Sequence, residues 1–115
     1  MAYVEGFVIP VPAAKKDAFV AAARAVAKVF KEHGATRVVE CWGDDVPDGK
    51  LTDFRSAVNA EEGEVVVFAW IEYPSKAARD AILAKTAADP RSRNVEMPFD
   101  RKRMIFGGFA PLIDE

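Results

Sequence analysis

Two segments with helical periodicity, each set between two segments with the pattern of a β-strand, constrain this sequence most. The first runs from Ala13 to His33 and carries an apolar stripe with spacings of four, three and four residues: Phe19, Ala23, Val26 and Phe30. Such spacings place side chains on one face of a helix. Gly34 follows, and glycine is favoured just past a helix end because it accepts a positive φ. A second helix is predicted from Ser75, a suitable N-cap, to about Ala88.

Four segments are predicted to be strands because they alternate or are rich in β-branched and aromatic residues. They are Tyr3–Val11, Thr36–Trp42, Glu64–Tyr73 and Arg103–Phe109. Residues 44–63 form an excursion with many turn-forming residues, within which Leu51–Val58 fits a short strand. Arg91–Lys102 is expected to be a loop.

The order of these elements is β-α-β, an excursion, then β-α-β, within 115 residues. This length fits one domain, residues 1–115. Two such units predict an α+β fold of the ferredoxin-like, split βαβ type, in which two helices cover one face of an antiparallel sheet.

The other face of the predicted sheet is too apolar to meet water. In this prediction small and β-branched side chains face the helices: Val4, Gly6, Val8, Val39, Cys41, Val65, Val67, Ala69 and Ile71. The bulkier alternate set lies on the uncovered face: Tyr3, Glu5, Phe7, Ile9, Val38, Glu40, Trp42, Val66, Phe68, Trp70 and Glu72. We therefore expect a homodimer, with a second sheet packed on this face across a two-fold axis. The alternative is that the 44–63 excursion or the C-terminal tail covers the face within one chain.

Composition narrows the setting. The formal charge of -2 and the pI near 5.5 do not indicate the basic surface that nucleic-acid-binding proteins carry. The longest apolar run, Val65–Ile71, is too short to span a membrane. Cys41 is the single cysteine and no signal peptide is visible, so we expect a cytoplasmic protein in a reducing compartment. No cofactor is indicated.

Several stretches resemble the YbaA-like bacterial proteins, a family of unknown function. They are Y-V-E-G-F-V, V-V-E-C-W, V-P-D-G-K-L-T-D-F, F-A-W-I-E-Y-P-S-K, M-P-F-D-R-K-R-M-I-F-G-G-F and the final I-D-E, which together span nearly the whole chain. The resemblance implies a bacterial cytosolic setting and a fold of the dimeric α+β barrel group, but no reaction. That wider group includes cofactor-free monooxygenases, small isomerases, haem-handling enzymes and effector-sensing domains, and fold analogy is weak evidence for chemistry.

Glutamates among aromatic residues are the first candidate site. Glu5, Glu40 and Glu72 are predicted beside Trp42, Phe68 and Trp70, where lost hydration would raise a carboxyl pKa and suit a general acid or base. Glu40 is the preferred catalytic residue, and the aromatic residues are the expected pocket walls. The alternative is that these glutamates sit at strand ends and pair with Arg37 or Arg103.

Other candidates are weaker. His33, the only histidine, is a second catalytic candidate, although the helix C-terminus is sufficient structural reason for it. Asp53 and Arg103 are candidates for orienting a polar ligand group. The spacing of Asp44, Asp45, Asp48 and Asp53 does not follow a calcium loop, so we expect no metal site. Cys41 is expected to be inert core.

Two functional hypotheses follow. The first is a homodimeric barrel that binds a small organic molecule between sheet and helices, with simple acid–base or cofactor-free oxygen chemistry. The second is a non-catalytic binding or assembly module whose aromatic sheet face only forms the dimer. The residues leave open whether the protein is an enzyme.

Overall fold

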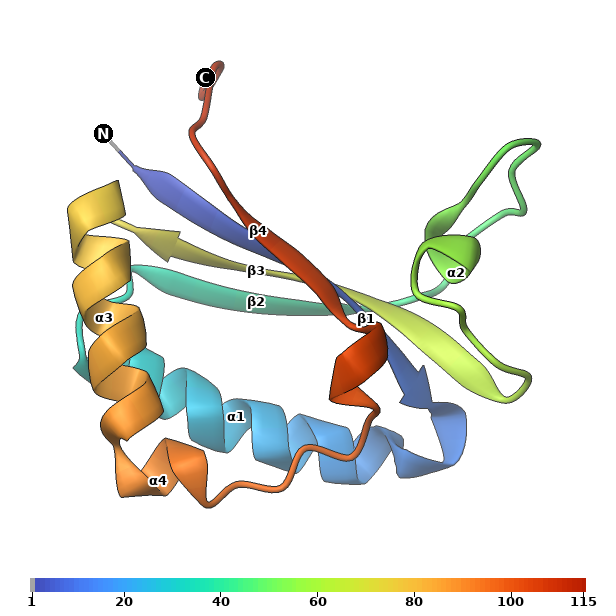
Figure 1. Cartoon of the computed structure of the whole chain (residues 1–115), viewed down its shortest axis with the longest axis horizontal. Coiled ribbons are helices and arrows are strands. Elements are labelled where there is room, and N and C mark those ends of the chain that lie inside the picture. The colour runs from blue at the N-terminus through green and yellow to red at the C-terminus, as the bar shows by residue number, and fades with distance from the viewer. Residues whose placement is uncertain (1) are drawn as a thin grey trace.

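A computed structural model describes residues 2–115 and shows one sheet with helices on one side (Figure 1). The strands are β1 (Tyr3–Pro12), β2 (Arg37–Trp42), β3 (Glu64–Tyr73) and β4 (Ile105–Phe109). The α-helices are α1 (Lys16–Glu32), α2 (Phe54–Ala57), α3 (Lys76–Ala88) and α4 (Pro90–Arg93), and 3-10 turns lie at Ala13–Lys15 and Arg101–Arg103.

The sheet has the order β2-β3-β1-β4, and all three neighbouring pairs are antiparallel. This is the order of a ferredoxin-like split βαβ fold, so the predicted fold class is confirmed. Helices α1, α3 and α4 lie on one side of the sheet, and α2 lies beyond its other side (Figure 1). The C-terminal segment rises on that same second side.

Local sequence explains where the helices begin and end. Gly34 follows α1 with φ +119°, as the prediction required. The Ser75 side chain accepts a hydrogen bond from the backbone N–H of Ala78 and caps α3. The predicted short strand at Leu51–Val58 is wrong, because the Asp53 carboxylate accepts the backbone N–H of Ser56 and starts helix α2 instead.

Two apolar clusters between sheet and helices form the core. One gathers Ile9, Val11, Phe19, Ala23, Val67 and Ala69, and the other gathers Ala35, Ile71, Tyr73 and Ile82. The odd-numbered residues of β3 therefore face the helices, as predicted. In β1, however, it is Ile9 and Val11 that face the helices, so the predicted orientation of this strand is wrong.

The predicted orientation of β2 is also wrong, as the pairing of its residues with those of β3 shows. Residues paired in register share a face, and Glu40 and Trp42 are paired with Ala69 and Val67. Glu5, Glu40 and Trp42 therefore lie on the helix side of the sheet and not on the uncovered face. Cys41, predicted to be core, points to the uncovered face and is exposed.

Candidate functional site

The uncovered face is built from three rows of side chains that run across the four strands. In the order β2, β3, β1, β4, the rows are Arg37-Glu72-Val4-Phe109, then Val39-Trp70-Gly6-Gly107, then Cys41-Phe68-Val8-Ile105. The middle row ends in two glycines. The face therefore has a depression at Gly6 and Gly107, where the flanking rows carry side chains and the middle row does not.

This depression is an apolar hollow of about 600 Å³. Its lining residues are Val4, Gly6, Phe7, Val8, Phe68, Trp70, Ile105, Phe106, Gly107 and Phe109. None carries an ionisable side chain. The ring of Phe109 lies near both glycines, since a Cβ atom placed on Gly6 or Gly107 would meet it at 3.5 Å or 3.6 Å.

Aromatic rings form one wall of the hollow. The Phe68 ring lies 6.0 Å from the Trp70 ring and 6.0 Å from the Phe54 ring of α2, measured between centroids. The excursion thus reaches the face at one end but leaves Phe68 47% exposed and Phe109 62% exposed. The alternative that the excursion covers the face within one chain therefore holds only at that end.

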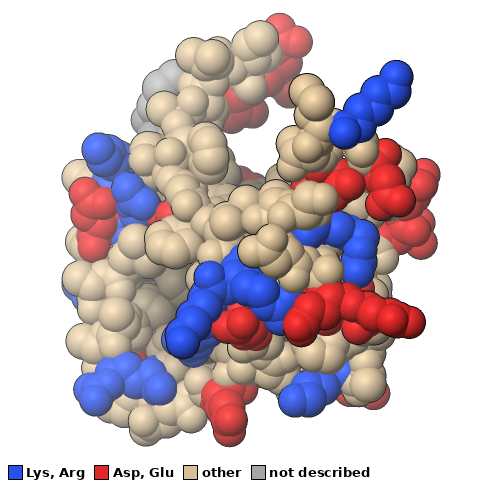
Figure 2. Space-filling view, turned by 45° about the vertical axis from the view of Figure 1, so that its right-hand side comes forward, with Lys and Arg blue, Asp and Glu red and all other residues tan. Residues whose placement is uncertain are grey.

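The excursion and the C-terminal segment rise on opposite sides of the uncovered face (Figure 1). Figure 2 shows the notch that they leave between them, with mostly uncharged surface along it. The apolar side chains at their tips have no cover, since Leu51, Leu112 and Ile113 are almost fully exposed.

One polar corner borders the hollow. The indole N–H of Trp70 donates to Glu72 Oε2 at 2.9 Å, and Arg37 Nη1 lies 3.6 Å from the same oxygen. The predicted pairing of a glutamate with Arg37 is thus confirmed for Glu72. Of the sequence-predicted residues, Phe68, Trp70 and Glu72 come together here.

Glu40 and Trp42 lie on the opposite side of the sheet. Trp42 packs against Phe19, and the Lys16 ammonium lies 5.1 Å from the centre of its ring. Glu40 keeps access to water on the edge strand, yet desolvation by the surrounding protein raises its pKa to about 7. No cation pairs with it in residues 2–115. Glu40 therefore has a raised pKa, but it lies across the sheet from Phe68, Trp70 and the hollow, not among them as predicted.

A buried ion pair lies under α3. Glu5 is 3% exposed and accepts a hydrogen bond of 2.5 Å from Arg79, which also lies over the Tyr3 ring. Sequence reasoning missed Arg79, although a buried carboxylate on β1 needs a cation from a facing helix. Nearby, burial raises the pKa of Tyr73, whose hydroxyl has no partner in the described chain.

His33 belongs to an ion-pair cluster at the end of α1. Its Nε2 lies 2.9 Å from Asp89 Oδ2, and Arg91 bonds both Asp89 and Glu32. Arg91 and His33 together hold the pKa of Asp89 well below its ordinary range. The cluster joins α1 to the start of α4, so the structural interpretation of His33 accounts for its position.

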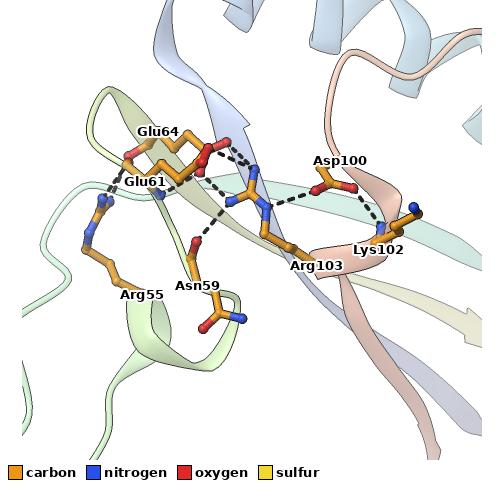
Figure 3. Close-up of polar contacts among 7 residues, drawn as sticks. All are labelled: Arg55, Asn59, Glu61, Glu64, Asp100, Lys102 and Arg103. Atoms are coloured by element: carbon orange, nitrogen blue, oxygen red, sulfur yellow. Dashed lines mark hydrogen bonds and ion pairs between the residues drawn. The ribbon is translucent and has the colours of Figure 1, made fainter.

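Arg103 and Asp53 hold the excursion in place. Arg103 donates to both Glu64 oxygens at 2.6 Å and 2.7 Å, and to Asp100 and the Asn59 carbonyl (Figure 3). Arg55 binds the carbonyls of Glu61 and Glu64 from the other side. Asp53 caps α2 and binds Gly49 N–H, and these backbone bonds lower its pKa. Neither Asp53 nor Arg103 lies at the hollow.

Two kinds of feature are absent from residues 2–115, a cluster of metal-binding side chains and a membrane-spanning helix. No group of three or more histidine, cysteine or carboxylate side chains there is placed to hold a metal ion. Among the same residues, no helix is both long and apolar enough to cross a membrane.

Comparison with known proteins identifies the family but no activity. Residues 2–101 match the family described as "Protein of unknown function (DUF1428)", and the chain belongs to this family. It is 62% identical over 117 aligned positions to "Uncharacterized protein YbaA" of Escherichia coli K12, with all of both chains covered. The same identity and coverage hold for YbaA of Shigella flexneri. The resemblance seen in the sequence is therefore confirmed.

Solved structures with low identity share the fold. A dimeric ferredoxin-like protein from an uncultured marine organism has a TM-score of 0.65 at 10% identity, over 99% of this chain and 98% of that one. An uncharacterised NIPSNAP domain protein from Burkholderia xenovorans has a TM-score of 0.64 at 19% identity, over 98% and 99%. At these identities the likeness supports the ferredoxin-like fold alone.

Proposed function

We propose that this member of the DUF1428 family is a homodimer whose two uncovered sheet faces enclose an apolar chamber for a small, flat organic molecule. The observation that carries the proposal is the glycine-floored hollow, which lies on a face too apolar to stay in water. Exposed aromatic and aliphatic side chains surround it, among them Phe68, Ile105 and Phe109. A second copy is the simplest cover for such a patch.

The size and lining of the hollow favour a ligand over direct sheet-to-sheet packing. A volume of about 600 Å³ is within the range of small-molecule pockets. Packing of two sheets with interlocking side chains would instead fill the middle row. The dimeric ferredoxin-like protein with the same fold is consistent with an assembly of this kind.

Binding is favoured over turnover in this chamber. Its lining has no ionisable side chain, and Glu40, the preferred acid or base, lies across the sheet from it. Acid–base chemistry on a bound molecule would have to use Glu72 at the border. We also propose that the protein is cytoplasmic, as expected from the sequence.

Equilibrium dialysis with naphthalene tests the chamber. We expect saturable binding to the wild-type dimer and a loss of at least about tenfold in affinity for Gly6→Val, whose methyl groups would enter the hollow. An Ala87→Val variant, changed on the exposed surface of α3, is the matched control and should bind like wild type. A dimer without saturable naphthalene binding would instead support the assembly module.

A further inference from the structure

The border of the hollow carries the charged side chains that lie nearest to it. The hollow itself offers only apolar surface, so an apolar body is all that its lining can recognise. The first charged side chains next to it are Glu72 and Arg37, in the row beside the one that contains Trp70. They lie on the same face as the hollow, next to Val4, which lines it.

Each of these two side chains has a free hydrogen-bonding group. Glu72 Oε2 is held by Trp70 and faces Arg37, whereas Oε1 has no partner within residues 2–115. The Arg37 side chain is 63% exposed, and its shortest contact with Glu72 is the 3.6 Å approach of Nη1, so the guanidinium has N–H groups on the water side that can donate to a ligand. Trp70 fixes the carboxylate, and its ring at the same time forms the wall of the hollow.

A neutral hydroxyl matches this pair of groups. It donates one hydrogen bond, which Glu72 Oε1 accepts, and it accepts one, which Arg37 donates. A carboxylate would meet the negative charge of Glu72, and an ammonium group would meet the positive charge of Arg37. A hydroxyl meets neither penalty and gains two charge-assisted hydrogen bonds.

Resting on the chamber described under the proposed function, we infer that the ligand is an aromatic molecule with one neutral hydroxyl at its end. The rings lie in the hollow between the Trp70 and Phe109 rings, and the hydroxyl lies between Glu72 and Arg37. Glu72 is the specificity-determining residue of the site.

Equilibrium dialysis of three probes of equal ring size tests the inference at neutral pH: 2-naphthol, naphthalene and 2-naphthoate. A hydrogen bond to a charged group has a typical value that corresponds to at least about tenfold in affinity. We therefore expect wild type to bind 2-naphthol at least about tenfold more tightly than naphthalene. Glu72→Gln should weaken this preference, because the amide keeps an oxygen for Trp70 and no longer offers an acceptor to the hydroxyl proton, so that only the hydrogen bond from Arg37 remains.

The control separates this inference from the chamber itself. Glu62→Gln removes an exposed glutamate that lies outside the lining, and it should keep the preference for 2-naphthol. Equal affinity for 2-naphthol and naphthalene, or tightest binding of 2-naphthoate with its loss in Arg37→Met, would overturn the hydroxyl assignment but leave the chamber intact. No saturable binding of any probe would overturn the chamber as well.

Discussion

Gly6 of β1 and Gly107 of β4 lie directly opposite each other in register, and the side chains that they lack leave the apolar hollow between Trp70 and the edge of the sheet. Glycine within a strand is unfavourable because it loses more conformational freedom on folding than other residues. Neither glycine has a positive φ, so the backbone does not require glycine there. We therefore attribute the two glycines to the hollow, because any side chain at either position would reduce its volume.

Gly6→Val should therefore raise stability while it weakens binding. Valine suits a strand, and its methyl groups would contact the Phe109 ring, so we expect a gain of about 0.5–1 kcal/mol in the free energy of unfolding by urea. Gly108→Val is the matched control on the opposite face, where the new side chain would collide with the Tyr3 ring and hydroxyl and destabilise the fold. A loss of stability in both variants would contradict this account of the hollow.

Removal of one partner of the buried Glu5–Arg79 pair should be severely destabilising. Arg79→Met leaves the Glu5 carboxylate 3% exposed and without its cation, and an uncompensated charge in such a place is strongly destabilising. Urea unfolding measures this loss. Arg37→Met, which removes an exposed partner of Glu72, should cost less than about 1 kcal/mol. Similar losses in the free energy of unfolding for the two variants would show that burial does not determine how much the Arg79 contact stabilises the fold.

The Arg103 cluster should make stability depend on pH. Arg103 holds the pKa values of Glu64 and Asp100 below their ordinary range. A lowered carboxyl pKa stabilises the folded state above the unfolded value of about 4 and loses that effect as pH falls through the folded value. Arg103→Met should thus unfold at a lower temperature than wild type at pH 7, and the gap should narrow below about pH 4. If the difference in unfolding temperature stays constant with pH, the loss of stability in Arg103→Met comes from lost packing and not from the charge interactions.

Glu40 should show the opposite pH dependence. Its pKa is raised to about 7, so the folded state binds the proton more tightly than the unfolded chain does. Its contribution is greatest below the unfolded value of about 4 and is lost as pH rises through about 7. Glu40→Gln should therefore gain melting temperature over wild type at pH 8 and not at pH 4. The carboxyl carbon-13 chemical shift of Glu40 should titrate with a midpoint near pH 7. A midpoint near pH 4 would show that the surrounding protein does not raise the pKa of Glu40.

Element order and fold class could be predicted from the sequence because periodicity and capping residues act locally. The stripe of α1, Gly34 and the Ser75 cap all indicate their own elements without reference to the rest of the chain. Helix α2 was missed because it is only Phe54–Ala57, too short to show a period, and depends on the Asp53 cap.

The faces of β1 and β2 could not be predicted, because both sides of these strands are apolar. Alternation alone does not say which side meets the helices. Glu5 was expected on the uncovered face because it alternates with the small residues of β1, but it lies on the helix side, where Arg79 from α3 satisfies its carboxylate. In β3, where Phe68, Trp70 and Glu72 alternate with smaller residues, the bulk pattern did indicate the face. Part of the candidate site was therefore predicted, and the glycine floor was found only through register.

Native mass spectrometry at low micromolar concentration tests the central claim most directly, which is that a second copy covers the uncovered face. We expect wild type at twice the 12.6 kDa mass of the chain. Ile105→Asp, which places a charge on the face at a side chain already 44% exposed, should appear at the mass of one chain with unchanged circular dichroism. A wild-type protein at the mass of one chain, or an Ile105→Asp variant that remains a dimer, would contradict the account.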